Sequence, residues 1–180
     1  MLIGLCGPAG AGKNTVADIL ACEGSGEFVL LAFADPIYQC ISAITGLPAS
    51  RLKDRTVKEQ VISWLGRSPR QLLQSMGTDW GRDQVHPEIW IRITMERASR
   101  HMSLGHRVVV TDVRFDNEAE AIVAAGGEVW RVIRPGWRCL DVEAANHRSE
   151  AGVSDRLVSR TVENSGTLDD LKRSVAAAKI

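Results

Sequence analysis

The feature that most constrains this chain is the stretch GPAGAGKNT, Gly7 to Thr15, which directly follows the apolar run LIGLC. Its glycines allow the backbone to curl and to aim N–H groups inward at an anion. Lys13 adds a positive charge, and a helix that begins there adds its N-terminal N–H groups and dipole. A strand before and a helix after are the context in which G-x-x-x-x-G-K-[ST] binds nucleotide phosphates. We therefore predict that the phosphates are bound by Gly7, Ala9, Gly10, Ala11, Gly12, Lys13, Asn14 and Thr15.

The last position of the pattern departs from expectation. A hydroxyl residue normally stands there to bind Mg²⁺, and this sequence has Asn14. Mg²⁺ is a hard cation that takes oxygen ligands, so the amide oxygen of Asn14 could replace the hydroxyl directly or through one water. Thr15 points about 100° away around the helix and is better placed for an α-phosphate oxygen. We predict that Asn14 is the ligand and leave Thr15 as the alternative.

Two other structures would use a similar stretch. One is a tight glycine turn with an exposed Lys13. The other is a dinucleotide-binding fold, because Asp35 lies roughly 20 residues further on, near the end of the second apolar segment. That fold requires G-x-G-x-x-G, whereas the spacing here is G-x-x-G-x-G. It also gives Lys13 no function, so the pattern favours the phosphate-binding loop.

Short apolar segments alternate with helical patterns along the chain. The strand-like segments are 2–6, 28–33, 107–112, 128–133 and 156–164. The helical patterns are 13–22, 36–45, 57–65, 69–80, 87–104, 116–125 and 167–178. Near-continuous apolar strands that alternate with helices predict a three-layer α/β/α fold around a parallel five-stranded sheet. We expect one domain with the core 1–45, 105–133 and 156–180, a helical insertion 46–104, and an excursion 134–155.

The charges balance, with 22 Lys and Arg against 22 Asp and Glu. No overall field therefore recruits nucleic acid or a membrane surface, and an anion must be gathered by a local group of cations. The four cysteines form no C-x-x-C pair, which is typical of a reducing cytosol. The apolar start lacks a basic lead and no apolar run reaches membrane-spanning length, so we expect a soluble cytoplasmic protein. We leave open whether the protein forms a homodimer, because the sequence alone does not show whether apolar side chains form a patch on the surface.

Charged residues follow two of the predicted strands. Asp112 ends the third strand, where an aspartate can hold Mg²⁺, and Arg114 can reach phosphate oxygens with its planar fork of donors. The alternative is that Asp112 and Asp116 only cap turns or the next helix. Asp35 precedes a proline, as a helix N-cap often does. The same carboxylate could lie near a transferred phosphoryl group.

The insertion carries polar residues with helical spacing. Arg70 and Gln74 share one helical face at i, i+4, with apolar residues on the other face. They could clamp a phosphate and a base edge, while Gly77 and Thr78 would add backbone donors. Arg82 is a further cation in this segment. The alternative for all of them is a solvated face.

Aromatic residues and the excursion give weaker signals. Trp90, with Trp80 as a second candidate, could stack on a base, although tryptophans are more often part of a core. The segment 134–155 has no clear period, and a loop of that length is usually functional or disordered. Glu150 could fix it by pairing with Arg148 or with a distant arginine.

In this order, the motifs of the chain resemble those of the bacteriophage deoxynucleoside monophosphate kinases, which are P-loop kinases related to the adenylate kinases. The matching segments are GPAGAGKNT, FADPI, RQLLQSMGTDWGR with a nearby IW, VVVTDVRFDNEAEAI, HRSE and VENSGTLDDL. The resemblance implies transfer of the γ-phosphoryl of ATP to a deoxynucleoside monophosphate (dNMP), with Mg²⁺, to give the diphosphate and ADP. It also implies that 46–104 holds the acceptor, that 134–155 is a lid, and that a phage-encoded protein works in the host cytoplasm.

The resemblance further implies roles for individual residues. Arg131 and Arg134 would reach the phosphates, and Asn164 to Gly166 would lie against adenine. The implied catalytic residues are Lys13, Asp35, Asp112, Arg114 and Arg134, and the metal ligands are Asn14 and Asp112. The implied acceptor-binding residues are Asp35, Ile37, Tyr38, Arg70, Gln74, Gly77, Thr78, Arg82, Trp90, Arg114 and Glu150. Tyr38 departs from the family, which leads us to expect a lysine there.

Two other functions remain open. Dephospho-coenzyme A and phosphomevalonate kinases share the glycine loop and a similar lid, so the acceptor could be a different phosphorylated molecule. A nucleotide-dependent switch would bind or slowly hydrolyse nucleotide and phosphorylate no acceptor. The cationic insertion speaks against the switch.

Overall fold

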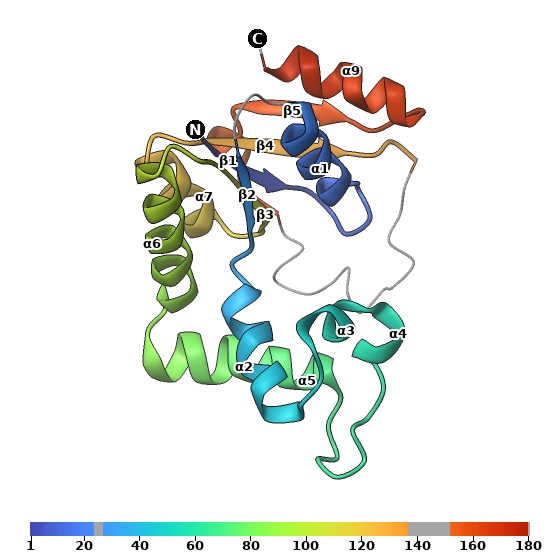
Figure 1. Cartoon of the computed structure of the whole chain (residues 1–180), viewed down its shortest axis with the longest axis vertical. Helices are drawn as coiled ribbons and strands as arrows, with labels where there is room; N and C mark the ends of the chain where they lie inside the picture. The colour runs from blue at the N-terminus through green and yellow to red at the C-terminus, as the bar shows by residue number, and fades with distance from the viewer. Residues whose placement is uncertain (24–26, 137–151, 180) are drawn as a thin grey trace. The chain divides into compact units, whose positions relative to one another are not determined.

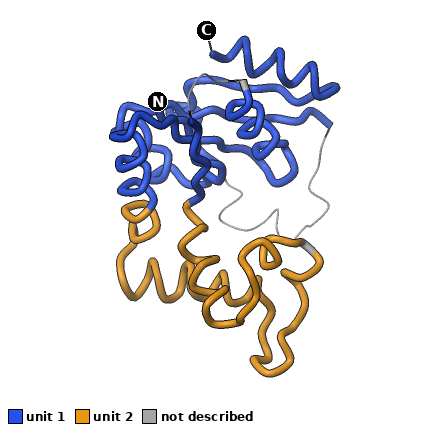
Figure 2. The backbone as a smooth tube through the Cα atoms, viewed as in Figure 1, with its two compact units in different colours: residues 1–32, 94–180 blue, residues 33–93 orange. Residues whose placement is uncertain are grey.

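The computed structural model describes residues 1–23, 27–136 and 152–179 (Figure 1). These residues belong to two compact units (Figure 2): unit 1 comprises Met1–Ala32 and Thr94–Ile180, and unit 2 comprises Phe33–Ile93. The functional division into a core, an acceptor-binding insertion at 46–104 and a lid at 134–155 remains a prediction.

Unit 1 is built on a five-stranded parallel sheet. Its strands are β1 (Leu2–Cys6), β2 (Phe28–Leu31), β3 (Arg107–Val113), β4 (Glu128–Ile133) and β5 (Arg160–Glu163). They lie in the order β2-β3-β1-β4-β5, and each neighbouring pair is parallel. The predicted five-stranded parallel sheet is confirmed. Because β1 is central, the loop that leaves its carboxyl end emerges between β3 and β4.

Helices cover both faces of this sheet. All five residues of β1 are buried, and side chains alternate between the faces of a strand. Ile3 and Leu5 belong to a core with α1 (Lys13–Glu23) and α9 (Leu168–Ala178). Gly4 faces α7 (Asp116–Ala124): a Cβ at Gly4 would lie 2.5 Å from Cδ1 of Ile122. The three-layer α/β/α fold is therefore confirmed.

The helices are amphipathic, as a layered fold requires. Helix α9 buries Leu171, Val175 and Ala178, which recur on one helical face, and it exposes Lys172 and Arg173 between them. Thr167 begins this helix with a capping box that includes Asp170. Over the described part of the chain, no helix has the length and apolar character needed to cross a membrane.

Unit 2 is helical. It contains α2 (Asp35–Thr45), α3 (Ala49–Lys53), α4 (Arg55–Lys58), α5 (Pro69–Gln74), a π-helix η1 (Ser75–Val85) and the first residues of α6 (Ile89–Ser103). Ile37, Ile41, Leu52 and Trp90 form its buried core, against which Leu72, Leu73 and Met76 pack. The apolar side of the segment around Arg70 and Gln74 is thus partly buried against this core, on the side that the sequence predicts.

Two predicted helices differ in the structure. The helix predicted at 57–65 ends at Lys58, because Ile62 pairs with Arg67 across a turn in which Gly66 has a φ of 67°. The helix predicted at 69–80 is α-helical only to Gln74 and continues as the π-helix η1. A Cβ at Gly81 would lie 2.5 Å from the Trp90 ring. This close helix packing is a long-range feature that periodicity does not report.

The last strand is shorter than predicted. The sequence predicts a strand over 156–164, whereas β5 covers Arg160–Glu163 and Asp155–Leu157 form a 3₁₀ turn, η3. Ser159 N donates to the Val129 carbonyl at 2.8 Å, just before the register of β4 with β5 begins. The segment ahead of β5 is therefore free to turn toward α7, with which η3 makes contact.

The glycine loop leaves β1 through a close backbone contact. Gly7 has a φ of 131°, and a Cβ there would lie 2.2 Å from the Val132 carbonyl oxygen on β4. Both a strained backbone and a collision would result from any side chain. Gly105 has a φ of 84° but open space around it. A substitution there therefore measures the energetic cost of the positive φ without a collision.

We expect Gly7→Ala to lower the free energy of unfolding by more than about 3 kcal/mol, because strain and overpacking add. Gly105→Ala should cost only about 1–2 kcal/mol, the penalty for a left-handed backbone alone. Urea unfolding of both variants measures the difference. Equal losses would show that Val132 can move aside and that the contact does not fix the loop.

Candidate active site

The glycine loop is closed on itself by its lysine. Lys13 Nζ donates to the carbonyl oxygens of Gly7 at 2.7 Å and Pro8 at 2.9 Å. Gly10 and Gly12 adopt positive φ values of 80° and 101°, which allow the loop to curl back to the start of α1. The predicted loop residues thus follow β1 and lead into α1, the order of elements that binds phosphate at a helix N-terminus.

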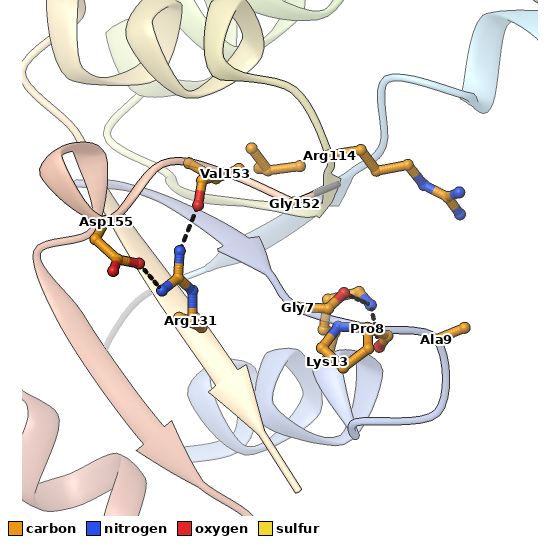
Figure 3. A pocket seen from close by; sticks show the side chains of 10 residues that line it. Gly7, Pro8, Ala9, Lys13, Arg114, Arg131, Gly152, Val153 and Asp155 are labelled. Atoms are coloured by element: carbon orange, nitrogen blue, oxygen red, sulfur yellow. Dashed lines mark hydrogen bonds and ion pairs between the residues drawn. The ribbon is translucent and has the colours of Figure 1, made fainter. Parts of the chain in front are cut away.

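A pocket of about 310 Å³ opens beside this loop (Figure 3). The lining residues are Gly7, Pro8, Ala9, Lys13, Val113, Arg114, Arg131, Gly152, Val153 and Asp155. Three of them, Lys13, Arg114 and Arg131, carry positive charge, against one carboxylate, Asp155. Lys13 comes from the start of α1, Arg114 directly follows β3, and Arg131 lies on β4 two residues before its end. Such a pocket suits a polyanion.

Arg131 is held by the segment that precedes β5. Its guanidinium donates to the Asp155 carboxylate and to the Val153 carbonyl oxygen (Figure 3). The hydrogen bond with Asp155 raises the pKa of Arg131 above its usual value. Cys6, the register partner of Arg131, is buried, and burial raises the pKa of its thiol. Arg131 is therefore a fixed cation beside a neutral thiol. Arg134, the first residue after β4, is exposed.

Arg114 is positioned through its backbone by a residue that sequence reasoning missed. The Glu118 carboxylate is only 2% exposed and accepts hydrogen bonds from Arg114 N at 2.8 Å and Phe115 N at 3.2 Å. Glu118 thereby caps α7 from its third position, the glutamate half of a capping box. The spacing FDNE was the available signal. These two hydrogen bonds fix the turn between Asp112 and α7.

Asp112 lies near the end of β3, and Asn14 lies in the helix that follows β1, the neighbour of β3. Asp112 is the residue before Val113, which pairs with Cys6 at the end of β1, and Asn14 lies in the exposed first turn of α1. Within the described ranges, no three His, Cys, Asp or Glu side chains cluster as a metal site. Mg²⁺ usually takes one or two protein oxygens besides waters and substrate phosphates. A carboxylate and an amide oxygen fit that donor set.

The loop after β5 contacts the glycine loop. Asn164 Nδ2 donates to the Ala11 carbonyl oxygen at 2.9 Å, and a Cβ at Gly12 would lie 2.5 Å from the same nitrogen. At Gly166, a Cβ would lie 2.4 Å from the Asp170 carboxylate that caps α9. Asn164 thus supports the glycine loop, and its contact with adenine remains a prediction.

In unit 2, cations gather around Tyr38. Lys53 Nζ pairs with Asp35 at 2.9 Å, and Lys58 Nζ donates to the Tyr38 hydroxyl at 3.0 Å. The two ammonium groups lie 5.3 and 5.6 Å from the centre of the Tyr38 ring. The position at which the resemblance implied a lysine is therefore surrounded by two lysines from α3 and α4.

The other residues predicted to bind an acceptor divide into two groups. Arg70 pairs with Glu59 at 2.5 Å, while Gln74 and Thr78 are exposed and Arg82 is partly buried. These four have polar groups that a ligand could contact. Glu150 and most of the segment 134–155 lie outside the described residues.

The second group is structural. Ile37 and Gly77 are buried, and Trp90 is 3% exposed, with Nε1 donating to the Gly77 carbonyl at 2.8 Å. A ring so deeply buried offers no face to a base, so the structure does not support the stacking expected of Trp90. Trp80, the second candidate, is 47% exposed. Sequence alone does not separate the tryptophan in the core from the accessible one.

The sequence and the fold of this chain are similar to those of known proteins. Residues 49–175 match the family model described as deoxynucleotide monophosphate kinase. A protein of Acanthamoeba polyphaga mimivirus with the same family description is 32% identical over 76% of this chain and 75% of its own. The deoxynucleoside-5′-monophosphate kinase of Escherichia phage T5 is 28% identical over 91% of this chain and 89% of its own. Dephospho-CoA kinase from Campylobacter jejuni shares the fold, with a TM-score of 0.53 at 17% identity over 98% of this chain and 94% of its own.

Proposed function

The chain belongs to the deoxynucleotide monophosphate kinase family, and we propose that it transfers the γ-phosphoryl group of ATP to a dNMP at the pocket beside the glycine loop. The observation that carries this proposal is that Lys13, Arg114 and Arg131 all line one pocket. Because the chain as a whole has no net charge, this local group of cations is what would gather two polyanionic substrates.

Phosphoryl transfer requires positioning and neutralisation more than covalent chemistry. An oxygen of the acceptor phosphate attacks the γ-phosphorus in line, and the bond from that phosphorus to the bridging oxygen of ADP breaks. Lys13 and the two arginines offset the negative charge that both substrates bring together. Asn14 and Asp112 would hold Mg²⁺, which when bound would neutralise phosphate oxygens.

Lys13 would exchange partners when ATP binds. Its bonds to the Gly7 and Pro8 carbonyls hold the ammonium beside the pocket, and phosphate oxygens are stronger, charged acceptors. Thr15 would contact the α-phosphate, and Asn164 would hold the loop through Ala11. The segment 134–155, with Arg134 at its start, would exclude water as a lid.

We assign acceptor binding to polar residues of unit 2. Asp35, Arg70, Gln74, Thr78 and Arg82 would contact the monophosphate. Arg114 would contact a phosphate at the pocket of unit 1. Arg70 is the best candidate for the acceptor phosphate, because its planar fork can leave the exposed Glu59 carboxylate for a phosphate at little cost.

A screen of phosphate acceptors with Mg²⁺ and ATP tests the function. We expect ADP formation with one or more dNMPs and at least a hundredfold loss in Lys13→Ala, about the effect of one preorganised electrostatic contact. Lys172→Ala, which removes an exposed lysine from a pair with Asp169, is the matched control and should be fully active. Activity on dephospho-coenzyme A alone, or ATP hydrolysis that no acceptor changes, would refute the proposal.

The metal assignment predicts opposite results for neighbouring residues. Asn14→Ser should keep activity because it restores an oxygen ligand, whereas Asn14→Leu should raise the Mg²⁺ concentration for half-maximal activity about tenfold or more. Thr15→Val should chiefly raise the KM for ATP. Activity is titrated with Mg²⁺ at saturating substrates. A shift of the Mg²⁺ dependence in Thr15→Val and none in Asn14→Leu would assign the ligand to Thr15.

The acceptor assignment predicts a selective change in KM. Arg70→Ala and Arg82→Ala should each raise the KM for the dNMP about tenfold or more, the loss expected for one charged hydrogen bond, with the KM for ATP within about twofold. Arg92→Ala removes an exposed arginine of unit 2 that pairs with Glu88 and should change neither. Equal increases for both substrates would contradict a dedicated acceptor site in unit 2.

A further inference from the structure

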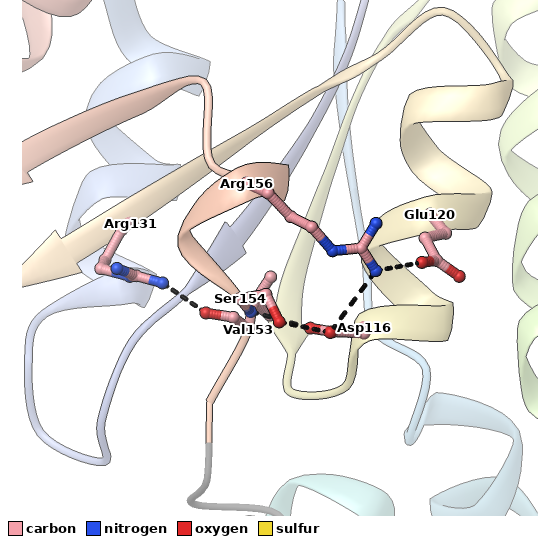
Figure 4. A network of polar contacts seen from close by, with 6 residues as sticks. All are labelled: Asp116, Glu120, Arg131, Val153, Ser154 and Arg156. Carbon is pink, nitrogen blue, oxygen red and sulfur yellow. Dashed lines mark hydrogen bonds and ion pairs between the residues drawn. The ribbon is translucent and has the colours of Figure 1, made fainter.

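Asp116 begins α7 but does not cap it. The N-cap position of this helix is Phe115, and the carboxylate that accepts from the backbone N–H groups of Arg114 and Phe115 is that of Glu118. The Asp116 carboxylate is directed to a distant part of the chain instead: it accepts from Ser154 N at 2.8 Å and from Ser154 Oγ at 2.5 Å (Figure 4). The expectation that Asp116 could serve as a helix cap is therefore wrong.

Ser154 lies between the two residues that hold Arg131. The Val153 carbonyl and the Asp155 carboxylate both accept hydrogen bonds from the Arg131 guanidinium, and the backbone of Ser154 joins them. Residues 152–154 precede η3, and the Ser154 carbonyl accepts a hydrogen bond from Leu157 N at 3.0 Å. Side-chain contacts add to this backbone bond. Val153 contributes a buried side chain that is 5% exposed, and Asp116 contributes the two bonds to Ser154.

These bonds are of the stronger kind. Both are accepted by a carboxylate, which makes them charge-assisted. They lower the pKa of Asp116 below its usual value, with the Ser154 hydroxyl as the largest cause. The Asp116 carboxylate is therefore charged at neutral pH and keeps Ser154 in one orientation.

We propose that Asp116 is a positioning residue for nucleotide binding, which acts through Ser154 to hold the Val153 carbonyl and Asp155 where they aim Arg131 into the pocket. Arginine has five guanidinium N–H groups, and two remain after these two bonds and the hydrogen bond with the Cys6 side chain, so a held Arg131 can still contact a phosphate. The inference rests on the proposed function, because it assigns Arg131 to ATP.

The same two elements provide a matched control. Arg156 joins η3 to α7 through Glu120 at 2.7 Å, and it also lies 3.8 Å from Asp116 (Figure 4). Both side chains of the Arg156–Glu120 pair are at least half exposed, and such pairs contribute little. Glu120→Gln removes a charge from the same helix without touching Ser154.

The test measures the dissociation constant for ATP by calorimetry, with Mg²⁺ and without acceptor. Asp116→Ala should weaken ATP about tenfold, as expected for two lost charge-assisted bonds that preorganise one contact. Ser154→Ala, which keeps the backbone donor, should have a smaller effect in the same direction. Glu120→Gln should stay within about twofold of the original protein. In steady-state assays the KM for ATP should rise while the KM for the dNMP stays constant.

A double-mutant cycle decides whether Asp116 acts through Arg131. In an Arg131→Ala background, Asp116→Ala should change ATP affinity less than about twofold. The same tenfold loss in both backgrounds, or an equal loss in Glu120→Gln, would overturn the inference. Urea unfolding of each variant confirms that it is folded, and Ser154→Ala supplies the cycle if Asp116→Ala is not. If the original protein bound no ATP, the proposed function itself would be refuted. Additive losses of ATP affinity in the cycle are a different result, because they would refute only the role of Asp116.

Discussion

The structure depends on the place of β1 at the centre of the sheet. A strand that pairs on both sides and is buried throughout delivers the chain to the one point where the ends of β3 and β4 are both adjacent. The chain then has to turn at once, and Gly7 does so against the Val132 carbonyl with no room for a Cβ. The register of β1 with β3 and β4 therefore places the glycine loop next to the residues that follow β3, which include Arg114, and next to Arg131 on β4. Ligand sites at such carboxyl edges are the rule in open parallel sheets.

Residues without chemistry of their own place the cations that line the pocket. Glu118 holds the backbone of Arg114, Val153 and Asp155 hold the side chain of Arg131, and Asn164 supports the loop that carries Lys13. Val153, Asp155 and Asn164 are distant in sequence from the groups that they hold, and Glu118 is a buried carboxylate. Preorganised groups need not reorganise when charge moves during a reaction, which gives these supports a functional meaning beyond stability.

Much of the fold could be predicted because it is encoded locally. The strands are recognisable by their apolar runs, and the glycine loop by a spacing that few other structures need. The features that sequence could not predict are long-range. The apolar residues at 57, 61 and 65 have helical spacing, yet the Ile62–Arg67 pairing ends the helix. Trp90 is a core residue because Gly77 and Gly81 face it, and no local pattern distinguishes it from the exposed Trp80. Asp116 resembles a helix cap in sequence because its partner, Ser154, lies 38 residues away.

Cations in each of the two units pair with carboxylates in a similar way. Arg131 pairs with Asp155, Arg70 with Glu59, and Lys53 with Asp35. At least one partner in each pair is more than half exposed, and exposed ion pairs contribute only about 0–1 kcal/mol. In the proposed acceptor site of unit 2, a phosphate would therefore replace the Glu59 or Asp35 carboxylate at little cost. The backbone carbonyl of Val153 differs, because a buried residue fixes it. Arg131 thus has an exposed carboxylate partner and a backbone partner from a buried residue, and the two together set its direction.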